Sequence, residues 1–265
     1  NTEVAKLLAE RGFTWTELCF SQTDSNYWVY NGRSDLSSLS NERSQEIIEI
    51  YRHHNITVTS IGVFTNLLEP DEKELEQNLR YFERLMEIAS INNVPYVSTE
   101  CGFIPGRRGI NADTYESDFQ RFKDNIRWLT QKAEKYNVTL ALEPCVLDII
   151  PSAKRTVDLI EQVGSDRLRV LLDPANLIAA NSEEDMFRYL APYIAYFHGK
   201  DRKVNDTYGR AIGDGDINWS RFLELYHEKT EGVPFIMEYV NGDNFCDIRD
   251  RVIAFDQKLQ QNVDR

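Results

Sequence analysis

The feature that most constrains the fold of this chain is a regular alternation of short β-rich runs with longer helical patterns. Each β-rich run ends in polar residues, and the segments between the runs carry apolar residues three and four positions apart, as at Leu75, Leu79 and Phe82. Repeated units of this kind are typical of a parallel sheet that is covered by helices. The seven predicted strands are Phe13–Phe20, Ile56–Val63, Val94–Thr99, Val138–Glu143, Leu168–Asp173, Tyr193–His198 and Pro234–Tyr239.

The helical segments and the chain length favour an α/β fold, a (β/α)8 barrel of the TIM type. Such a barrel needs about 250 residues, and no Pro-, Gly- or Ser-rich linker divides the 265 residues here, so one domain over residues 1–265 is expected. The sequence opens inside a helix, so either the first barrel strand is missing from it or the barrel closes irregularly. The predicted helices are Thr2–Arg11, Asn41–His54, Asp71–Asn92, Thr114–Tyr136, Ala153–Val163, Ser182–Leu190, Trp219–Lys229 and Ile248–Gln261.

Composition and charge narrow the range of partners. The 30 basic and 43 acidic residues leave a net charge of -13, which repels phosphate backbones and anionic lipids, so neither nucleic acid nor a membrane is an expected partner. No apolar run approaches the roughly 18 residues of a membrane span. The four cysteines are far apart and indicate reduced thiols, so a cytoplasmic protein is predicted. The sequence leaves the oligomeric state open, a homo-oligomer included.

Four consecutive predicted strands each end on a side chain that can bind a metal. These side chains are Glu143, Asp173, His198 and Glu238. The carboxyl ends of all barrel strands meet at one mouth, so residues far apart in the sequence become neighbours there. A polar residue often ends a single strand, but four in succession are harder to attribute to chance. Acids gathered at one mouth would also repel one another without a cation, which favours a metal site.

Three carboxylates and one imidazole form a hard, oxygen-rich ligand set. Such a set suits Mn²⁺ or Mg²⁺, with Co²⁺ and Zn²⁺ as further candidates. Two coordination positions would remain for oxygens of a substrate. The sequence therefore predicts a divalent-metal site at the mouth of the barrel.

These segments resemble the xylose isomerase-like TIM barrels, a superfamily of sugar phosphate isomerases, ketose 3-epimerases, inosose dehydratases and type IV endonucleases. The resemblance runs from about residue 12 to about residue 252. It implies that the four strand-end residues are the metal ligands and that the substrate is a small sugar-like molecule. The motifs that carry it are LALEP with Glu143, VLLDPAN with Asp173, FHGKD with His198, IGDGDINW ending at Trp219 and FIMEYV with Glu238.

One position departs from the pattern of the superfamily. Many members have histidine three residues after the strand aspartate, where this chain has Asn176. An amide can hydrogen-bond a substrate hydroxyl, but it is a weaker metal ligand and no proton carrier. With four histidines in the whole chain, the multi-zinc site of the endonucleases cannot be assembled. Asn176 is therefore expected to contact substrate, and a nuclease is the least favoured function.

Lys200 stands two residues after His198, so in an extended strand both side chains point into the mouth. We predict a substrate contact for Lys200, against the alternative of an exposed lysine in a basic loop with Arg202 and Lys203. The GDGDINW segment predicts a tight glycine turn with Asn218 near the cap of the next helix. That segment either shapes the loop or contacts the ligand directly.

Two further acids and several aromatic residues are candidates for the pocket. Glu17 lies on an early predicted strand and Glu100 directly follows another, so both are predicted to reach the substrate. The aromatic residues are equally compatible with the core. The candidate walls are Trp15, Trp28, Tyr30 and Phe103.

The favoured function is an isomerase or epimerase of a ketose, sugar phosphate or related polyol. A metal would grip neighbouring carbonyl and hydroxyl oxygens and stabilise an enediolate, while Glu143 and Glu238 move the proton. The same intermediate can instead expel a hydroxyl group, so a dehydratase or lyase of a keto-sugar or keto-inositol is the close alternative. A sugar-binding subunit without turnover is a third hypothesis, which stays open because Asn176 stands where many members of the superfamily have histidine.

Overall fold

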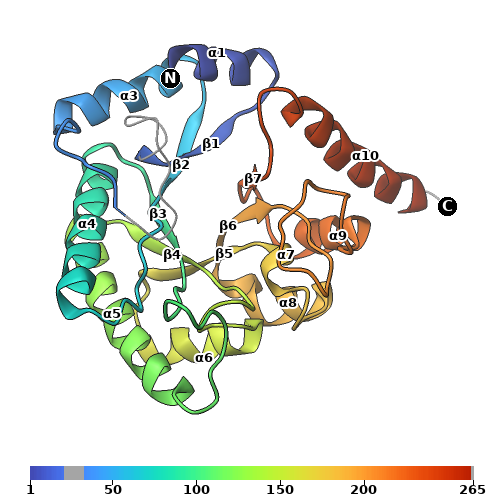
Figure 1. The fold of residues 1–265 in the computed structure, drawn as a ribbon. Helices are drawn as coiled ribbons and strands as arrows, with labels where there is room; N and C mark the ends of the chain where they lie inside the picture. Colours follow the sequence, from blue (N-terminus) through green and yellow to red (C-terminus); the bar gives the residue numbers. More distant parts are fainter. Residues whose placement is uncertain (21–32, 264–265) are drawn as a thin grey trace.

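The centre of the protein is a parallel sheet that curves into a near-closed barrel (Figure 1). The computed structural model describes residues 1–20 and 33–263, and within them seven strands follow one another in chain order. Every neighbouring pair is parallel. The strands are β1 Trp15–Leu18, β2 Thr57–Gly62, β3 Tyr96–Glu100, β4 Thr139–Glu143, β5 Leu168–Leu172, β6 Ile194–Gly199 and β7 Phe235–Met237.

Helices cover the outside of the barrel and alternate with the strands (Figure 1). All predicted strands and helices are present, and the helix ends lie within three residues of the predicted ends. Serine side chains cap the start of several helices. The hydroxyls of Ser40 and Ser182 each accept a hydrogen bond from the backbone N–H three residues later, that of Arg43 and that of Asp185. The helices are α1 Thr2–Glu10, α3 Asn41–His53, α4 Glu72–Ile91, α5 Tyr115–Tyr136, α6 Ala153–Val163, α7 Pro174–Leu177, α8 Glu183–Leu190, α9 Trp219–Lys229 and α10 Phe245–Val263, with a 3₁₀ turn at Ala191–Tyr193.

The short helix α7 was not predicted, and it begins directly at the end of β5. The Asp173 side chain accepts a hydrogen bond from the Ala175 backbone N–H, and Pro174 occupies the first helical position. An acidic cap followed by proline is a strong start signal, because proline has the right φ and lacks a donor that would go unpaired. Asp173 thus fixes the chain where strand becomes helix.

The barrel is open between its first and last strands. Within the described residues β1 and β7 form no backbone ladder with each other, although they approach closely. A groove of about 290 Å³ lies beside them, lined by apolar side chains that include Phe13, Trp15, Phe235 and Met237. The predicted TIM-barrel class is confirmed, with seven described strands and an opening between β7 and β1.

Alternation along the strands sorts the interior into layers. Leu140, Leu142 and Leu172 belong to the main core between the sheet and the helices. A separate buried cluster contains residues of the opposite parity on β4, β5 and β6, with a β7 residue packed against it. These are Ala141, Leu171, Tyr196 and Ile236. Two positions further along the chain stand Glu143 and His198, on β4 and β6, and Asp173 and Glu238, just past the ends of β5 and β7. The sequence thus places a polar layer directly above an apolar floor.

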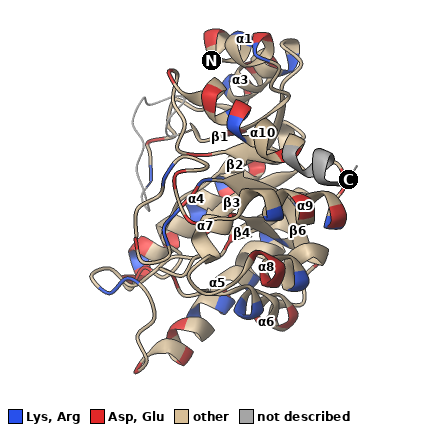
Figure 2. Ribbon diagram, turned by 90° about the vertical axis from the view of Figure 1, so that its right-hand side faces the viewer, with Lys and Arg blue, Asp and Glu red and all other residues tan. Residues whose placement is uncertain are grey.

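Acidic and basic residues are interspersed along the outer helices (Figure 2). Many pair within one helix, three or four residues apart, as Arg80 does with Glu76 and Arg188 with Asp185. None of the described helices combines the length and the apolar character needed to cross a membrane.

Candidate metal centre

Glu143, Asp173, His198 and Glu238 come together at the mouth of the barrel. One potential ligand atom from each lies within 4.8 Å of the others. Ligands on one ion at about 2.0–2.6 Å stand at most about 4–5 Å apart, so this spacing fits a shared ion. Glu143, Asp173 and His198 are buried, and the Glu238 side chain is 27% exposed. Glu238 therefore lies on the solvent side of the cluster, where a substrate would arrive.

Lys200 places its ammonium group among the three carboxylates. Its Nζ lies 2.6 Å from Glu238 Oε2, 2.7 Å from Asp173 Oδ2 and 3.4 Å from Glu143 Oε1. Burial lowers the pKa of Lys200, but the three carboxylates outweigh it and hold the pKa well above its ordinary value. Lys200 is 5% exposed, so the alternative of an exposed lysine in a basic loop is wrong. The acids therefore have an internal positive charge beside them, so their mutual repulsion does not by itself require a bound metal ion.

The imidazole of His198 faces a carboxylate on each side. Nδ1 lies 3.1 Å from Glu238 Oε1 and 3.7 Å from Glu143 Oε1, and Nε2 lies 3.5 Å from Glu17 Oε1. Burial lowers the pKa of His198, but Glu238 and Glu17 outweigh it and raise the pKa well above its ordinary value. His198 therefore joins the acidic mouth to the Glu17 side of the barrel.

The donor set fits a divalent ion. Within the described part of the chain, Asp173 Oδ2 and both ring nitrogens of His198 are buried without a hydrogen bond of good geometry. Buried polar atoms of this kind normally have a partner. Asp173 Oδ1 is already committed to the Ala175 N–H, at 2.8 Å, so Oδ2 is the oxygen that remains for a ligand. Carboxylate oxygens and an imidazole nitrogen would supply such an ion with ordinary ligands.

Behind the cluster, Asn176 supports Glu143. Its Nδ2 donates to Glu143 Oε1 at 2.7 Å, and its Oδ1 accepts from Arg202 Nη2 at 3.3 Å. Arg202 is buried, and its Nε and Nη1 lack a hydrogen-bond partner among the described residues. Arg202 thus offers donors close to the cluster, although the sequence pattern suggested an exposed loop residue.

Glu17 is held in a different way. Three hydroxyl groups donate to its Oε2, those of Ser60, Ser98 at 3.0 Å and Tyr196 at 2.5 Å. Burial raises the pKa of Glu17, but His198 and the hydroxyls of Ser60 and Tyr196 outweigh it and leave the pKa below its ordinary value. Glu17 is therefore a carboxylate anchored within the barrel, with its other oxygen toward His198.

The GDGDINW segment folds around the buried carboxylate of Asp201. This side chain accepts hydrogen bonds from the backbone N–H groups of Arg202, Gly213 and Ile217, and from the indole of Trp219. A Cβ at Gly215 would overlap the Asp201 carboxylate, so glycine is required there. The described contacts thus give the segment a loop-shaping role, and Asn218 caps α9 as predicted.

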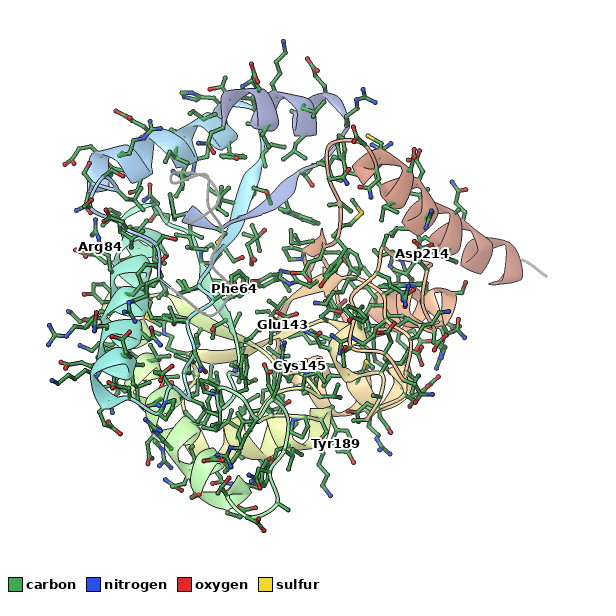
Figure 3. The ribbon with its side chains drawn as sticks, viewed as in Figure 1. Phe64, Arg84, Glu143, Cys145, Tyr189 and Asp214 are labelled. Carbon is green, nitrogen blue, oxygen red and sulfur yellow. The ribbon has the colours of Figure 1, made fainter. Side chains whose placement is uncertain are left out.

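The polar cluster opens into a cavity of about 670 Å³. Figure 3 shows Phe64, Glu143 and Cys145 around the middle of the ring of strands, whereas Arg84, Tyr189 and Asp214 lie at the periphery. Six of the predicted site residues line the cavity: Glu17, Glu100, Asn176, His198, Lys200 and Glu238. The other two, Glu143 and Asp173, are buried beneath it. Glu100 stands beside Glu143 in the β3–β4 register. That any of them binds substrate stays a prediction.

A family model described as xylose isomerase-like TIM barrel matches residues 5–259. The chain belongs to this family. The comparison with curated proteins finds no match. The family match covers nearly the whole chain, and it confirms the resemblance that the strand-end motifs carried.

Solved structures share the fold of this xylose isomerase-like barrel. D-psicose 3-epimerase from Clostridium cellulolyticum H10, determined with D-tagatose, has a TM-score of 0.72 at 17% identity, over 97% of this chain and 93% of that chain. The IOLI protein with a bound zinc atom has a TM-score of 0.73 at 17% identity, over 99% and 92%. A Mycobacterium smegmatis barrel in complex with magnesium has a TM-score of 0.68 at 18% identity, over 96% and 87%.

The aromatic walls of this xylose isomerase-like barrel differ from those predicted. Trp15 lies at the groove beside β1 and β7 instead of at the cavity, and among the described residues Phe64 lines the cavity in place of Phe103. The predicted walls Trp28 and Tyr30 lie outside the described residues. Phe64 stands two residues after the end of β2, so its position just past a strand was a better guide than residue type.

Asp148 is a buried acid that was not predicted from the sequence. It lies in the loop after β4, fully buried, with Arg108 Nη2 at 3.5 Å from its Oδ1. Burial raises its pKa to about 8, with Glu100 adding to the rise and Arg108 opposing it. The EPCVLDII segment contained this acid, but only the fold shows that its loop turns back toward Cys101 and Cys145.

Proposed function

We propose that this protein is a divalent-metal-dependent isomerase or epimerase of a ketose, sugar phosphate or related polyol. The observation that carries the proposal is the convergence of Glu143, Asp173, His198 and Glu238 beneath a cavity of about 670 Å³. A cavity of this size is suited to a small ligand. Structures of the same fold were determined with D-tagatose, zinc or magnesium, which supports both parts of the proposal.

The four residues would hold Mn²⁺ or Mg²⁺, with Co²⁺ and Zn²⁺ as alternatives. When bound, the ion would polarise substrate oxygens and so acidify a neighbouring C–H group. Glu143 and Glu238 reach the cluster from separate parts of the barrel, Glu143 from the end of β4 and Glu238 from just past β7, with β5 and β6 between them. In the proposed reaction one carboxylate removes the carbon-bound proton, and the other returns a proton to the opposite face.

The roles of the two glutamates follow from their surroundings. Glu143 is 1% exposed and accepts a hydrogen bond from Asn176, so it is fixed in place. Glu238 is more exposed. Burial raises its pKa, but the nearby Lys200 and His198 outweigh burial and lower the pKa, so the carboxylate stays ionised. The ionised form is the one that can accept a proton, and Glu238 lies at the edge of the cavity, so we assign it the role of the base.

Neighbouring donors would orient the substrate. Arg202 offers buried Nε and Nη1 groups beside Asn176, and both residues line the cavity. We propose that these donors bind substrate hydroxyl or carbonyl oxygens and so set which carbon faces Glu238. Lys200, Glu17 and Glu100 complete the polar lining.

The test is proton exchange in D₂O. Protein loaded with Mn²⁺ or Mg²⁺ is incubated with D-fructose, D-tagatose and phosphorylated ketoses, and proton NMR follows the C–H groups next to the carbonyl. Deuterium at one such carbon, together with an isomeric sugar, is the expected result. Exchange with loss of water would instead show the dehydratase chemistry. Binding of sugar without any exchange would leave a sugar-binding protein and overturn the proposal.

A further inference from the structure

The contacts of Lys200 set it apart from an ordinary pocket lysine. Its ammonium meets Asp173, Glu143 and Glu238, three of the four residues proposed to hold the metal. Its neighbours in the chain do not share this position. Arg202 reaches Asn176 instead, and Lys203 is exposed.

The oxygens that Lys200 contacts are those that remain for a metal. Asp173 Oδ1 caps α7, which leaves Oδ2, and Oδ2 lies 2.7 Å from Lys200 Nζ. Glu238 directs Oε1 to His198 and Oε2 to Lys200. A metal ion bound by these acids would therefore use the same oxygen atoms that the Lys200 ammonium group contacts now. Two cations so close together repel strongly where little water screens them.

We infer that Lys200 is an internal counter-ion of the metal centre, which neutralises the acids in the metal-free protein and is displaced into the cavity when a divalent ion binds. The inference rests on the proposed metal centre. The flexible four-carbon stem of lysine permits the movement, and Lys200 already lines the cavity that would receive it. Displacement brings the ammonium group into the cavity, where it can contact an oxygen of a bound sugar. Metal binding would thus prepare the cavity for substrate.

This arrangement has two consequences that can be measured. The ammonium and the ion compete for the same oxygens, so removing the ammonium should tighten metal binding. An effector commonly changes the affinity for a second ligand about 5- to 150-fold, and we expect a change of at least the lower size here. The metal-free protein should also lose stability without Lys200, because three buried or half-buried carboxylates would then face one another without the ammonium group between them.

The experiment compares Mn²⁺ binding by calorimetry in wild type, Lys200→Met, Lys200→Gln and Lys203→Met. Lys200→Gln removes the charge but retains a hydrogen-bond donor, so it serves if Lys200→Met does not fold. Lys203→Met is the matched control, because it removes the same charge from an exposed site in the same loop. Both Lys200 variants should bind Mn²⁺ at least about fivefold more tightly than wild type and melt at a lower temperature when metal-free. Lys203→Met should match wild type in both respects.

Amine labelling adds a direct readout of the displacement. In chelated protein Lys200 should resist acylation, and in Mn²⁺-loaded protein it should react, with Lys203 labelled equally in both states as the internal standard. Unchanged or weaker Mn²⁺ binding in the Lys200 variants, or protection of Lys200 in the loaded protein, would overturn the counter-ion role while leaving the metal centre intact. Absence of Mn²⁺ binding in wild type and all variants would overturn the metal centre and this inference together.

Discussion

The two halves of the barrel stabilise their buried carboxylates by different means. On the β1–β3 side, Glu17 of β1 receives hydrogen bonds from the hydroxyls of Ser60 on β2 and Ser98 on β3, and from Tyr196, which reaches it from β6. On the β4–β7 side, the acids instead surround one ammonium group, that of Lys200. Neutral donors fix a carboxylate in one arrangement, whereas a mobile cation can be exchanged for another. Under the proposed function, the first half therefore anchors a carboxylate, whereas the second half would bind the metal and transfer the proton.

The largest expected effect is that of Glu238→Gln on turnover. The amide retains a coordinating oxygen but cannot accept the proton, so the rate should fall by about 10²- to 10⁴-fold, the usual contribution of general acid–base catalysis. Mn²⁺ affinity, measured in the same samples, should change less. Turnover close to wild type on a substrate found by the D₂O experiment would show that Glu238 does not transfer the proton, whether or not it binds the metal.

The second prediction concerns the anchored half. Glu17→Ala leaves the hydroxyls of Ser60, Ser98 and Tyr196 without their acceptor inside the barrel, so the free energy of unfolding should fall by about 2–4 kcal/mol. Tyr196→Phe removes only one donor and should be milder. Urea unfolding in the presence of chelator gives the values. The stoichiometry of Mn²⁺ binding should stay at one, and loss of the ion in Glu17→Ala would erase the distinction between the two halves.

The third prediction concerns Asp148, an acid that the fold buries with one charged partner, Arg108, at 3.5 Å. Because burial raises the pKa of Asp148 to about 8, the folded protein retains a proton that the unfolded chain releases near pH 4. Stability is therefore lost as the pH rises from about 4 to about 8, at no more than about 1.4 kcal/mol per pH unit.

Asp148→Asn should remove that slope, so its stability relative to wild type should increase from pH 5 to pH 8. Thermal unfolding of chelated protein at both values measures the difference, and Asp166→Asn is the control because Asp166 is exposed. An equal change at both pH values would mean that Asp148 is ionised throughout in the folded protein.

The sequence sufficed for the fold and for the four clustered residues because both depend on local patterns. Period-2 alternation puts Glu143 above Ala141 and His198 above Tyr196, and the parallel topology brings all strand ends to one mouth. The roles of Arg202 and Asp148 depend on how long loops fold back over the mouth, which no local pattern encodes. The exact place of Lys200 was equally hidden, since strand parity gives the side of the sheet but not the partner atoms.

The most direct test of the metal centre is anomalous diffraction from crystals soaked in Mn²⁺. The account predicts one strong anomalous peak per chain, within about 2.0–2.6 Å of ligand atoms from Glu143, Asp173, His198 and Glu238. Asp173→Asn, which keeps the oxygen that caps α7 but replaces Oδ2, should weaken or abolish the peak. A peak bound elsewhere, or no peak while Lys200 keeps its contacts with the acids at saturating Mn²⁺, would contradict the account.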